Sequence, residues 1–320
     1  MPDISICMIT YNHEAFISKA IEGVLMQKTS YSYELVIGED GSTDNTRKIC
    51  ETYQAKYPDK IKLLPFTGNK GMAGNYIATQ EACTGKFIAL CEGDDYWTDP
   101  GKLEKQAKFL LENPGYNLCF HDVYNELNGK KTKSSIWDAP ETSDLNYLLS
   151  NRGYIKTLSV MFRNAEGIID FIRSAKDSPF LDLITYVAAV RTGSIRFFKE
   201  KMAVYRIHQG GVWSGTTSKQ IVEKTVAGYK ILYKLLPPEK QQLLKSRYMM
   251  MVEDYLMADK STGSADITIF KNDVIEIEDH VFLFLQNNCR ERKKVSFYAT
   301  SVSIGIMAKA IIKKIKQKLF

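Results

Sequence analysis

The sequence is poor in the features that build disulfide frameworks and zinc sites. It has six cysteines among 320 residues, none of them in a CxxC pair, and most lie inside apolar segments. We therefore expect reduced, buried cysteines in a cytosolic protein. Neither a disulfide scaffold nor a structural zinc site is predicted.

The sequence also has no apolar run long enough to span a membrane, no secretory leader and no dinucleotide-binding motif. The apolar run at residues 302–312 is too short to span a bilayer. The chain enters a strand-like run directly after Met1-Pro2-Asp3, so no secretory leader is expected. Gly68, Gly71 and Gly74 do not follow the GxGxxG spacing, which disfavours a dinucleotide-binding fold.

The net positive charge of the chain comes from one end. The net charge is +6, but residues 290–320 carry nine Lys or Arg against one Glu, so the remainder of the chain has a net charge of −2. A general nucleic-acid surface is therefore not predicted. The composition, with 44% hydrophobic and 25% charged residues, is that of a soluble protein with a sizeable core.

One apolar run ends in a cluster of acids. Residues 87–91 predict a buried strand, and Glu92, Asp94 and Asp95 follow it. Ligands bind at the carboxyl ends of strands in an open α/β sheet, and acids without a basic neighbour favour a bound cation. Mg²⁺ or Mn²⁺ prefers such oxygen ligands. The structural alternative is a polar loop that caps a helix beginning near Asp99 and Pro100.

Strand and helix patterns alternate over the first two hundred residues. The pattern predicts a parallel, doubly wound sheet. The expected strands are 4–9, 33–38, 61–66, 87–91, 117–122, 157–162, 195–198 and 202–207, and the later expected helices are 72–83, 164–174 and 180–192. Residues 125–150 are polar and predict an excursion over the sheet. Long helical patterns begin at residue 218, so we expect a domain of residues 1–216, a helical extension of 217–289 and a basic tail of 290–320.

Four short motifs in this order resemble the nucleotide-binding half of the family-two inverting glycosyltransferases. They are Thr10-Tyr11-Asn12, residues 39–44 (EDGSTD), residues 68–71 (GNKG) before a helix that carries Asn75, and residues 92–95 (EGDD). The resemblance covers residues 4–122 and continues less tightly to residues 205–214 (YRIHQGGVWS). It implies the GT-A fold, an α/β fold with a doubly wound mixed sheet, followed here by the helical extension.

The resemblance implies that this domain transfers a sugar from a UDP-sugar, and it assigns nucleotide contacts. Asp40 would accept a hydrogen bond from uracil N3, although a turn acid is the structural alternative. Glu39 stands where Asp is more frequent, which implies a weaker contact. The implied nucleotide-binding residues are Thr10, Tyr11, Asn12, Glu39, Asp40, Asn69, Gly71, Asn75 and Asp94.

The same resemblance implies a metal ligand and a catalytic base. Asp95 would hold Mn²⁺ or Mg²⁺ on the diphosphate, and His208 would complete that site, whereas His13 has no comparable sequence context. A cation there stabilises the leaving nucleoside diphosphate. Asp182 would deprotonate the acceptor hydroxyl, although the Gly usual before that acid is missing and Asp177 is a rival.

The end of the chain predicts membrane contact. Residues 301–320 form one amphipathic helix whose apolar stripe is bordered by lysines, so we expect peripheral attachment to the inner face of an anionic membrane. The alternative is a helix packed on the protein's own body. Residues 218–289 offer a surface for a homodimer.

The expected acceptor is a hydroxyl of a surface glycan or of its lipid-linked precursor, as in polysaccharide, O-antigen, capsule or teichoic acid synthesis. Two alternatives stay open: a sugar nucleotidyltransferase, whose Gly-rich basic N-terminal loop is missing here, and a catalytically silent glycan- or nucleotide-binding scaffold.

Overall fold

The computed structural model describes residues 1–248 apart from 67, 134–138, 152–153, 212–216 and 246. The basic tail, the later part of the helical extension and Trp213 lie outside the described residues. The chain divides into two compact units. The first comprises residues 1–148 and 153–214, and the second comprises residues 149–152 and the chain from 215 onward.

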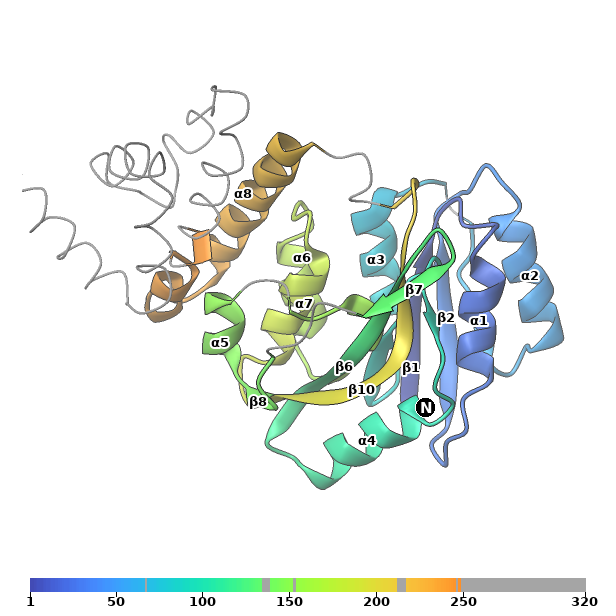
Figure 1. The fold of residues 1–320 in the computed structure, drawn as a ribbon, viewed down its shortest axis with the longest axis horizontal. Coiled ribbons are helices and arrows are strands. Elements are labelled where there is room, and N and C mark those ends of the chain that lie inside the picture. Colours follow the sequence, from blue (N-terminus) through green and yellow to red (C-terminus); the bar gives the residue numbers. More distant parts are fainter. Residues whose placement is uncertain (67, 134–138, 152–153, 212–216, 246, 249–320) are drawn as a thin grey trace, which may run out of the picture. The chain divides into compact units, whose positions relative to one another are not determined.

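The first unit is built on a mixed sheet with the strand order β3-β2-β1-β4-β9-β6-β10-β5 (Figure 1). Parallel pairing joins β1 to β2 and β4, β2 to β3, and β6 to β10, whereas β9 and β5 run antiparallel to their neighbours. β7 pairs with β6 and β8 with β10. The strands are β1 (Ile4–Thr10), β2 (Tyr33–Glu39), β3 (Ile61–Leu63), β4 (Phe87–Leu90), β5 (Tyr96–Trp97), β6 (Tyr116–Leu127), β7 (Lys130–Lys133), β8 (Thr142–Ser143), β9 (Met161–Arg163) and β10 (Ser194–Ile207).

Helices cover both faces of this sheet. Figure 1 shows α1 and α2 on one side of β1 and β2 and α3 on the other. Ile17, Ala20, Ile21 and Val24 of α1 are fully buried, as their helical spacing predicts, and Leu25 is half-buried. The helices are α1 (Ile17–Leu25), α2 (Thr46–Lys56), α3 (Gly71–Glu81), α4 (Lys102–Glu112), α5 (Leu145–Ser150), α6 (Ile168–Ser174) and α7 (Leu181–Ala189), with a 3₁₀ turn at Thr157–Ser159.

The second unit contains α8 (Ser218–Leu235). Thr217 and Gln220 form a capping box at its start, and Pro237 and Pro238 follow its end. Within the described part of the chain, no helix is both long and apolar enough to cross a bilayer.

Several expected elements differ in extent. The two strands expected at 195–198 and 202–207 form one strand, β10, because irregularities in its pairing with β6 absorb the charged residues between them. The strand expected to end at Asp122 continues to Leu127, and the expected excursion holds β7, β8 and α5. The strand expected at 157–162 is a 3₁₀ turn followed by β9. β5 was not expected, since two residues carry no periodicity.

Candidate active-site cleft

A cleft of about 860 Å³ lies at the carboxyl ends of β1, β2 and β4, entirely within the first unit. This is the edge where parallel strands deliver polar loops. Of the predicted site residues, those that line the cleft are Thr10, Tyr11, Asp40, Asn69, Gly71, Asn75, Asp94, Asp95 and Asp182; Glu92 and Arg206 line it as well.

The acidic loop is held close to β1. Cys91 N donates to Cys7 O at 3.1 Å and Gly93 N to Ile9 O at 2.9 Å, so pairing with β1 continues past the end of β4. A Cβ atom at Gly93 would lie 2.5 Å from Thr10 Oγ1, closer than side chains approach. Glycine at this position therefore allows the loop to present acids on both sides of it.

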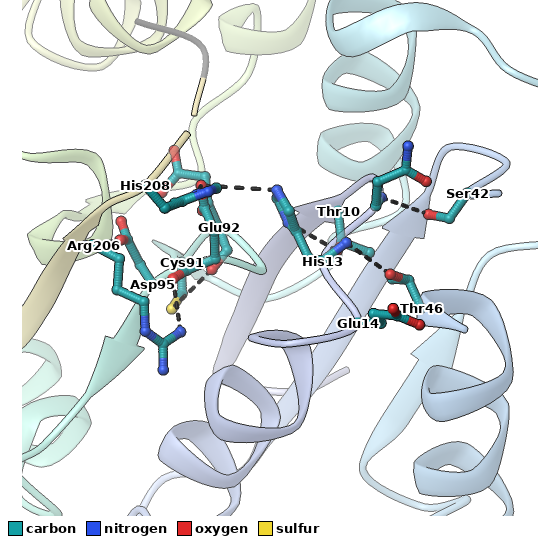
Figure 2. A network of polar contacts seen from close by, with 12 residues as sticks. Thr10, His13, Glu14, Ser42, Thr46, Cys91, Glu92, Asp95, Arg206 and His208 are labelled. Atoms are coloured by element: carbon teal, nitrogen blue, oxygen red, sulfur yellow. Dashed lines mark hydrogen bonds and ion pairs between the residues drawn. The ribbon is translucent and has the colours of Figure 1, made fainter. Parts of the chain in front are cut away.

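Asp94 lies between two histidines from distant parts of the chain. Its Oδ2 is 3.1 Å from His208 Nε2 and 3.8 Å from His13 Nε2. One ligand atom from each of the three side chains lies within 4.8 Å of the others. Figure 2 shows His13 and His208 pointing toward each other across this corner. Two imidazoles and one carboxylate are a donor set that binds divalent transition metals.

The histidines favour the ionised form of Asp94, and burial favours the neutral form of His13. Burial alone would raise the pKa of Asp94, but the hydrogen bond from His208 and the nearby histidines lower it below its usual range. Burial lowers the pKa of His13. A neutral imidazole and an ionised carboxylate are the forms that coordinate a metal ion.

Asp95 faces another partner. Its Oδ1 accepts a hydrogen bond from Arg206 N at 2.8 Å, and Arg206 Nη1 donates to Asp94 O at 2.7 Å. Burial, followed by the charges of Asp94 and Glu92, raises the pKa of Asp95 well above its usual value. No basic residue lies within the acidic loop itself, but β10 brings Arg206 beside these acids (Figure 2). The His–Asp cluster contains Asp94 and not Asp95.

Glu92 is the third acid of the loop. Its Oε2 is buried and has no hydrogen-bond partner among the described residues. Burial, with a smaller contribution from the charge of Asp94, raises the pKa of Glu92 to about 8. Near neutral pH this carboxyl is therefore mostly protonated, and it can donate a hydrogen bond to a ligand in the cleft.

Asp182 lines the cleft from the first turn of α7. Its Oδ1 accepts a hydrogen bond from Leu183 N at 2.7 Å. Its rival Asp177 is not among the described residues that line the cleft. Lys156 Nζ lies 4.7 Å from the ring centroid of Tyr205, and burial lowers the pKa of Lys156 against the opposing charges of Asp95 and Asp182.

The predicted nucleotide residues fall into two groups. Asp40 is buried and accepts a hydrogen bond from Lys70 N, while Tyr11 is 43% exposed at the rim. The other group ties loops together: Asn75 Nδ2 donates to Gly38 O, Asn12 Oδ1 accepts from Thr43 N, and Glu39 Oε1 accepts from Ser42 N. Asn12 and Glu39 are not among the described lining residues, so their contacts support the loops rather than the cleft.

His13 is the residue that sequence reasoning missed. It follows the Thr10-Tyr11-Asn12 motif directly, and Thr10 Oγ1 lies 3.2 Å from its Nδ1. Its position after the first strand, at the edge shared with the acids, was the available signal. Its partners Asp94 and His208 are remote in sequence, so only the fold reveals the cluster.

Comparison with known proteins agrees with this architecture. The family model "Glycosyl transferase family 2" matches residues 5–175. Over 151 residues, 47% of this chain and 56% of the relative, the chain is 36% identical to "UDP-Glc:alpha-D-GlcNAc-diphosphoundecaprenol beta-1,3-glucosyltransferase WfgD" of Escherichia coli. It spans about 60% of the length of several mycobacterial relatives that are 36% identical to it and have no described function.

Two solved structures share the fold. Residues 1–349 of Staphylococcus aureus TarS in complex with UDP-GlcNAc match with a TM-score of 0.58 and 17% identity, over 90% of this chain and 79% of that one. The mannosyltransferase PcManGT of Pyrobaculum calidifontis, in complex with GDP-Man and Mn²⁺, matches with a TM-score of 0.55 and 16% identity, over 93% and 85% of the two chains.

Proposed function

Because the chain belongs to glycosyl transferase family 2 and has the GT-A fold, we propose that it transfers a sugar from a UDP-sugar to an acceptor hydroxyl with inversion at the anomeric carbon. The observation that carries this proposal is one cleft that joins Asp40, Asp94 and Asp182. These acids suit a nucleoside, a metal-bound diphosphate and an acceptor hydroxyl.

The nucleoside end of the cleft is formed by the loops after β1 and β2. One oxygen of Asp40 accepts from Lys70 N at 2.7 Å, which fixes the carboxylate and leaves its other oxygen to accept from uracil N3. Tyr11 at the exposed rim offers a ring face to the base. TarS was solved with UDP-GlcNAc, which supports a uridine nucleotide, whereas PcManGT was solved with GDP-Man.

The residues present fit a divalent cation. His13, Asp94 and His208 would hold it, and Asp94 replaces Asp95 as the proposed carboxylate ligand because Asp95 Oδ1 is taken by Arg206 N. When bound, such an ion neutralises negative charge on the departing diphosphate. Two nitrogen donors favour Mn²⁺ over Mg²⁺, which prefers oxygen ligands. The Mn²⁺ in PcManGT supports this choice.

The remaining groups prepare the acceptor and the sugar. Asp182, which lines the same cleft, accepts the proton of the attacking hydroxyl. Glu92 lines the cleft beside these groups and offers its carboxyl group to a sugar hydroxyl. Arg206 holds the loop in place through Asp94 O and Asp95 Oδ1.

The acceptor we propose is a lipid-linked saccharide of a surface polysaccharide. The name of the relative WfgD, which includes a diphosphoundecaprenol-linked acceptor, supports this class. A peripheral position at the inner face of the membrane, with residues 290–320 on anionic lipid, follows from the basic tail. Residues 217–289 remain the proposed extension and dimer surface, joined to a catalytic domain that ends near residue 216.

Calorimetric titration of the full chain with UDP, with and without Mn²⁺, tests the proposal. We expect UDP binding that strengthens at least tenfold with Mn²⁺, and loss of that gain in Asp94→Asn. Asp59→Asn, a change at an exposed acid outside the cleft, is the matched control. UDP binding of the same strength with and without Mn²⁺ would instead favour a catalytically silent scaffold. Release of free sugar from UDP-sugars would be expected of a transferase and not of a scaffold.

A further inference from the structure

The ends of β6, β7 and β10 form a surface that continues outward from the cleft. In the sheet register Ile207 lies opposite Leu127, and Leu127 opposite Lys130. Paired residues of neighbouring strands share one face. Ile207 is 41% exposed and Leu127 49% exposed, and Ile207 also lines the cleft. We call Leu127, Lys130 and Ile207 the strand-end patch.

A polar row separates this patch from the deeper part of the cleft. Two residues earlier along β10 and β6, Tyr205 lies opposite Asn125, and Asn125 lies opposite Thr132 of β7. Tyr205 lines the cleft, and Asn125 Oδ1 is buried without a hydrogen-bond partner among the described residues. The face therefore runs from a polar row beside the cleft to an apolar pair and a lysine at the outer edge.

The other face of the same strands anchors them. Glu126 Oε2 accepts from Tyr96 Oη at 2.9 Å, and Glu126 Oε1 lies 3.4 Å from Arg206 Nε. Lys131, on this face, lies 5.7 Å from the Tyr96 ring centroid. Asn128 and Gly129 join β6 to β7 with positive φ angles of 50° and 74°, the conformation of a tight hairpin turn. The patch is thus presented by a supported hairpin, which Figure 1 shows beside the end of β6.

We propose that the strand-end patch binds the polyprenyl diphosphate end of a lipid-linked acceptor. The ammonium group of Lys130 complements the charge of a diphosphate, and the exposed side chains of Leu127 and Ile207 contact the first isoprene units. The polar row then faces the acceptor sugar, which reaches into the cleft past Tyr205. A free saccharide has no apolar part to match the pair. This assignment rests on the proposed transferase function.

Lysines on an edge strand also prevent unwanted strand pairing, so the experiment needs a variant that tests this simpler role. The double variant Leu127→Ser/Lys130→Gln changes the two patch residues that do not line the cleft and leaves Ile207 in place. The matched control is Leu111→Ser/Lys131→Gln, which changes a leucine of similar exposure, 47%, and the lysine on the opposite face of β7.

Vesicle cosedimentation of the full chain supplies the measurement. Phosphatidylcholine vesicles would carry undecaprenyl diphosphate in one set and phosphatidylglycerol at equal charge in the other. We expect the wild type and the control variant to bind the undecaprenyl diphosphate vesicles more tightly, and the patch variant to lose about tenfold in affinity for those vesicles alone.

Three outcomes overturn the assignment. The first is equal binding of the patch and control variants, and the second is no preference of the wild type for vesicles with undecaprenyl diphosphate. The third is an equal loss of affinity of the patch variant for both kinds of vesicle, which indicates a bilayer contact without acceptor specificity. UDP binding with Mn²⁺, measured on the same samples, should be unchanged in both variants. Failure of the wild type to bind UDP would refute the transferase proposal separately from the vesicle result.

Discussion

Two groups of buried or half-buried ionisable side chains lie in the first unit, and they differ in what they face. Glu92, Asp94 and Asp95 line the cleft. Lys102 and His121 are fully buried inside the core, and neither lines the cleft. We refer to the first as the cleft cluster and to the second, with Gln106, as the core cluster.

The polar groups of Lys102 and Gln106 in the core cluster contact other residues of the fold. Lys102 Nζ donates to Gln106 Oε1 at 2.7 Å and lies 4.0 Å from the ring centroid of Trp97, and Gln106 Nε2 donates to Ser159 O at 2.9 Å. Burial lowers the pKa of Lys102 to about 7. Burial, with the nearby Lys102 charge, lowers the pKa of His121 well below its usual value.

The contrast shows that burial and a shifted pKa do not mark a functional site by themselves. Both clusters have them. Only the cleft cluster faces open space and combines an ionised carboxylate with two imidazoles at ligand distance. The core cluster makes its contacts within the fold, so its effects should appear in stability, and those of the cleft cluster in binding and turnover.

The largest expected effect comes from Asp94→Asn in the cleft cluster. An amide removes the charge between His13 and His208, and the loss of metal-assisted leaving-group stabilisation should lower transfer from a UDP-sugar on the order of 10⁴-fold. The melting temperature should change by no more than a few degrees. Transfer at more than a tenth of the wild-type rate would contradict the assigned role of Asp94.

Asp182→Asn extends the comparison to a lining residue outside the acidic loop. Without a base for the acceptor hydroxyl, turnover should fall about 10³-fold. UDP and Mn²⁺ binding, measured by calorimetry, should stay at wild-type strength because Asp182 lies outside the His–Asp cluster. Asp177→Asn is the control, and a larger loss in that variant would transfer the role to Asp177.

The same substitution at His13, beside the cleft cluster, and at His121, in the core cluster, compares the two clusters directly. His13→Gln should weaken Mn²⁺ binding about 10–100-fold with little change in stability. His121→Gln should do the reverse, because it disturbs the 2.7 Å contact between His121 Nδ1 and Asp122 O in the core and should lower the free energy of unfolding by about 1–3 kcal/mol. Equal Mn²⁺ affinities of the two variants would remove the distinction.

Lys102→Met tests the core cluster through pH. The folded-state pKa of about 7 lies below the unfolded value of 10.5, so between these values the unfolded state binds more protons and stability should rise with pH. Within that window the Lys102 contribution should change the folded-to-unfolded ratio by up to about tenfold per pH unit, and the methionine variant should lack it. Denaturant unfolding at pH 6, 8 and 9 measures the difference, and parallel curves for both proteins would refute it.

Local patterns predicted much of the fold. The family resemblance and the GT-A fold are confirmed, and β1, β2, β4 and α3 lie close to their predicted positions. Each of these elements has an apolar periodicity and a polar corner of its own, which a short window reveals. The length of β10 was not predictable in this way, because its charged middle resembles a turn and only the pairing with β6 keeps it extended.

The site was predicted in its location but not in its internal contacts. Strand ends indicated where Asp40 and the acidic loop would meet. Asp94 and Asp95 are adjacent, however, and sequence gives no sign that one carboxylate faces two histidines while the other faces Arg206. These contacts join residues from β1, the acidic loop and β10, so they depend on long-range packing.

Gly93 has a consequence for attempts to redesign this enzyme. Even the methyl group of alanine would come within 2.5 Å of Thr10 Oγ1 and 3.0 Å of Ile17 Cδ1, so it would push the loop away from β1. A saturation library at codon 93 should therefore return almost only glycine among active clones, although this residue carries no reactive group. Mutational tolerance at the cleft is thus set by space as well as by chemistry.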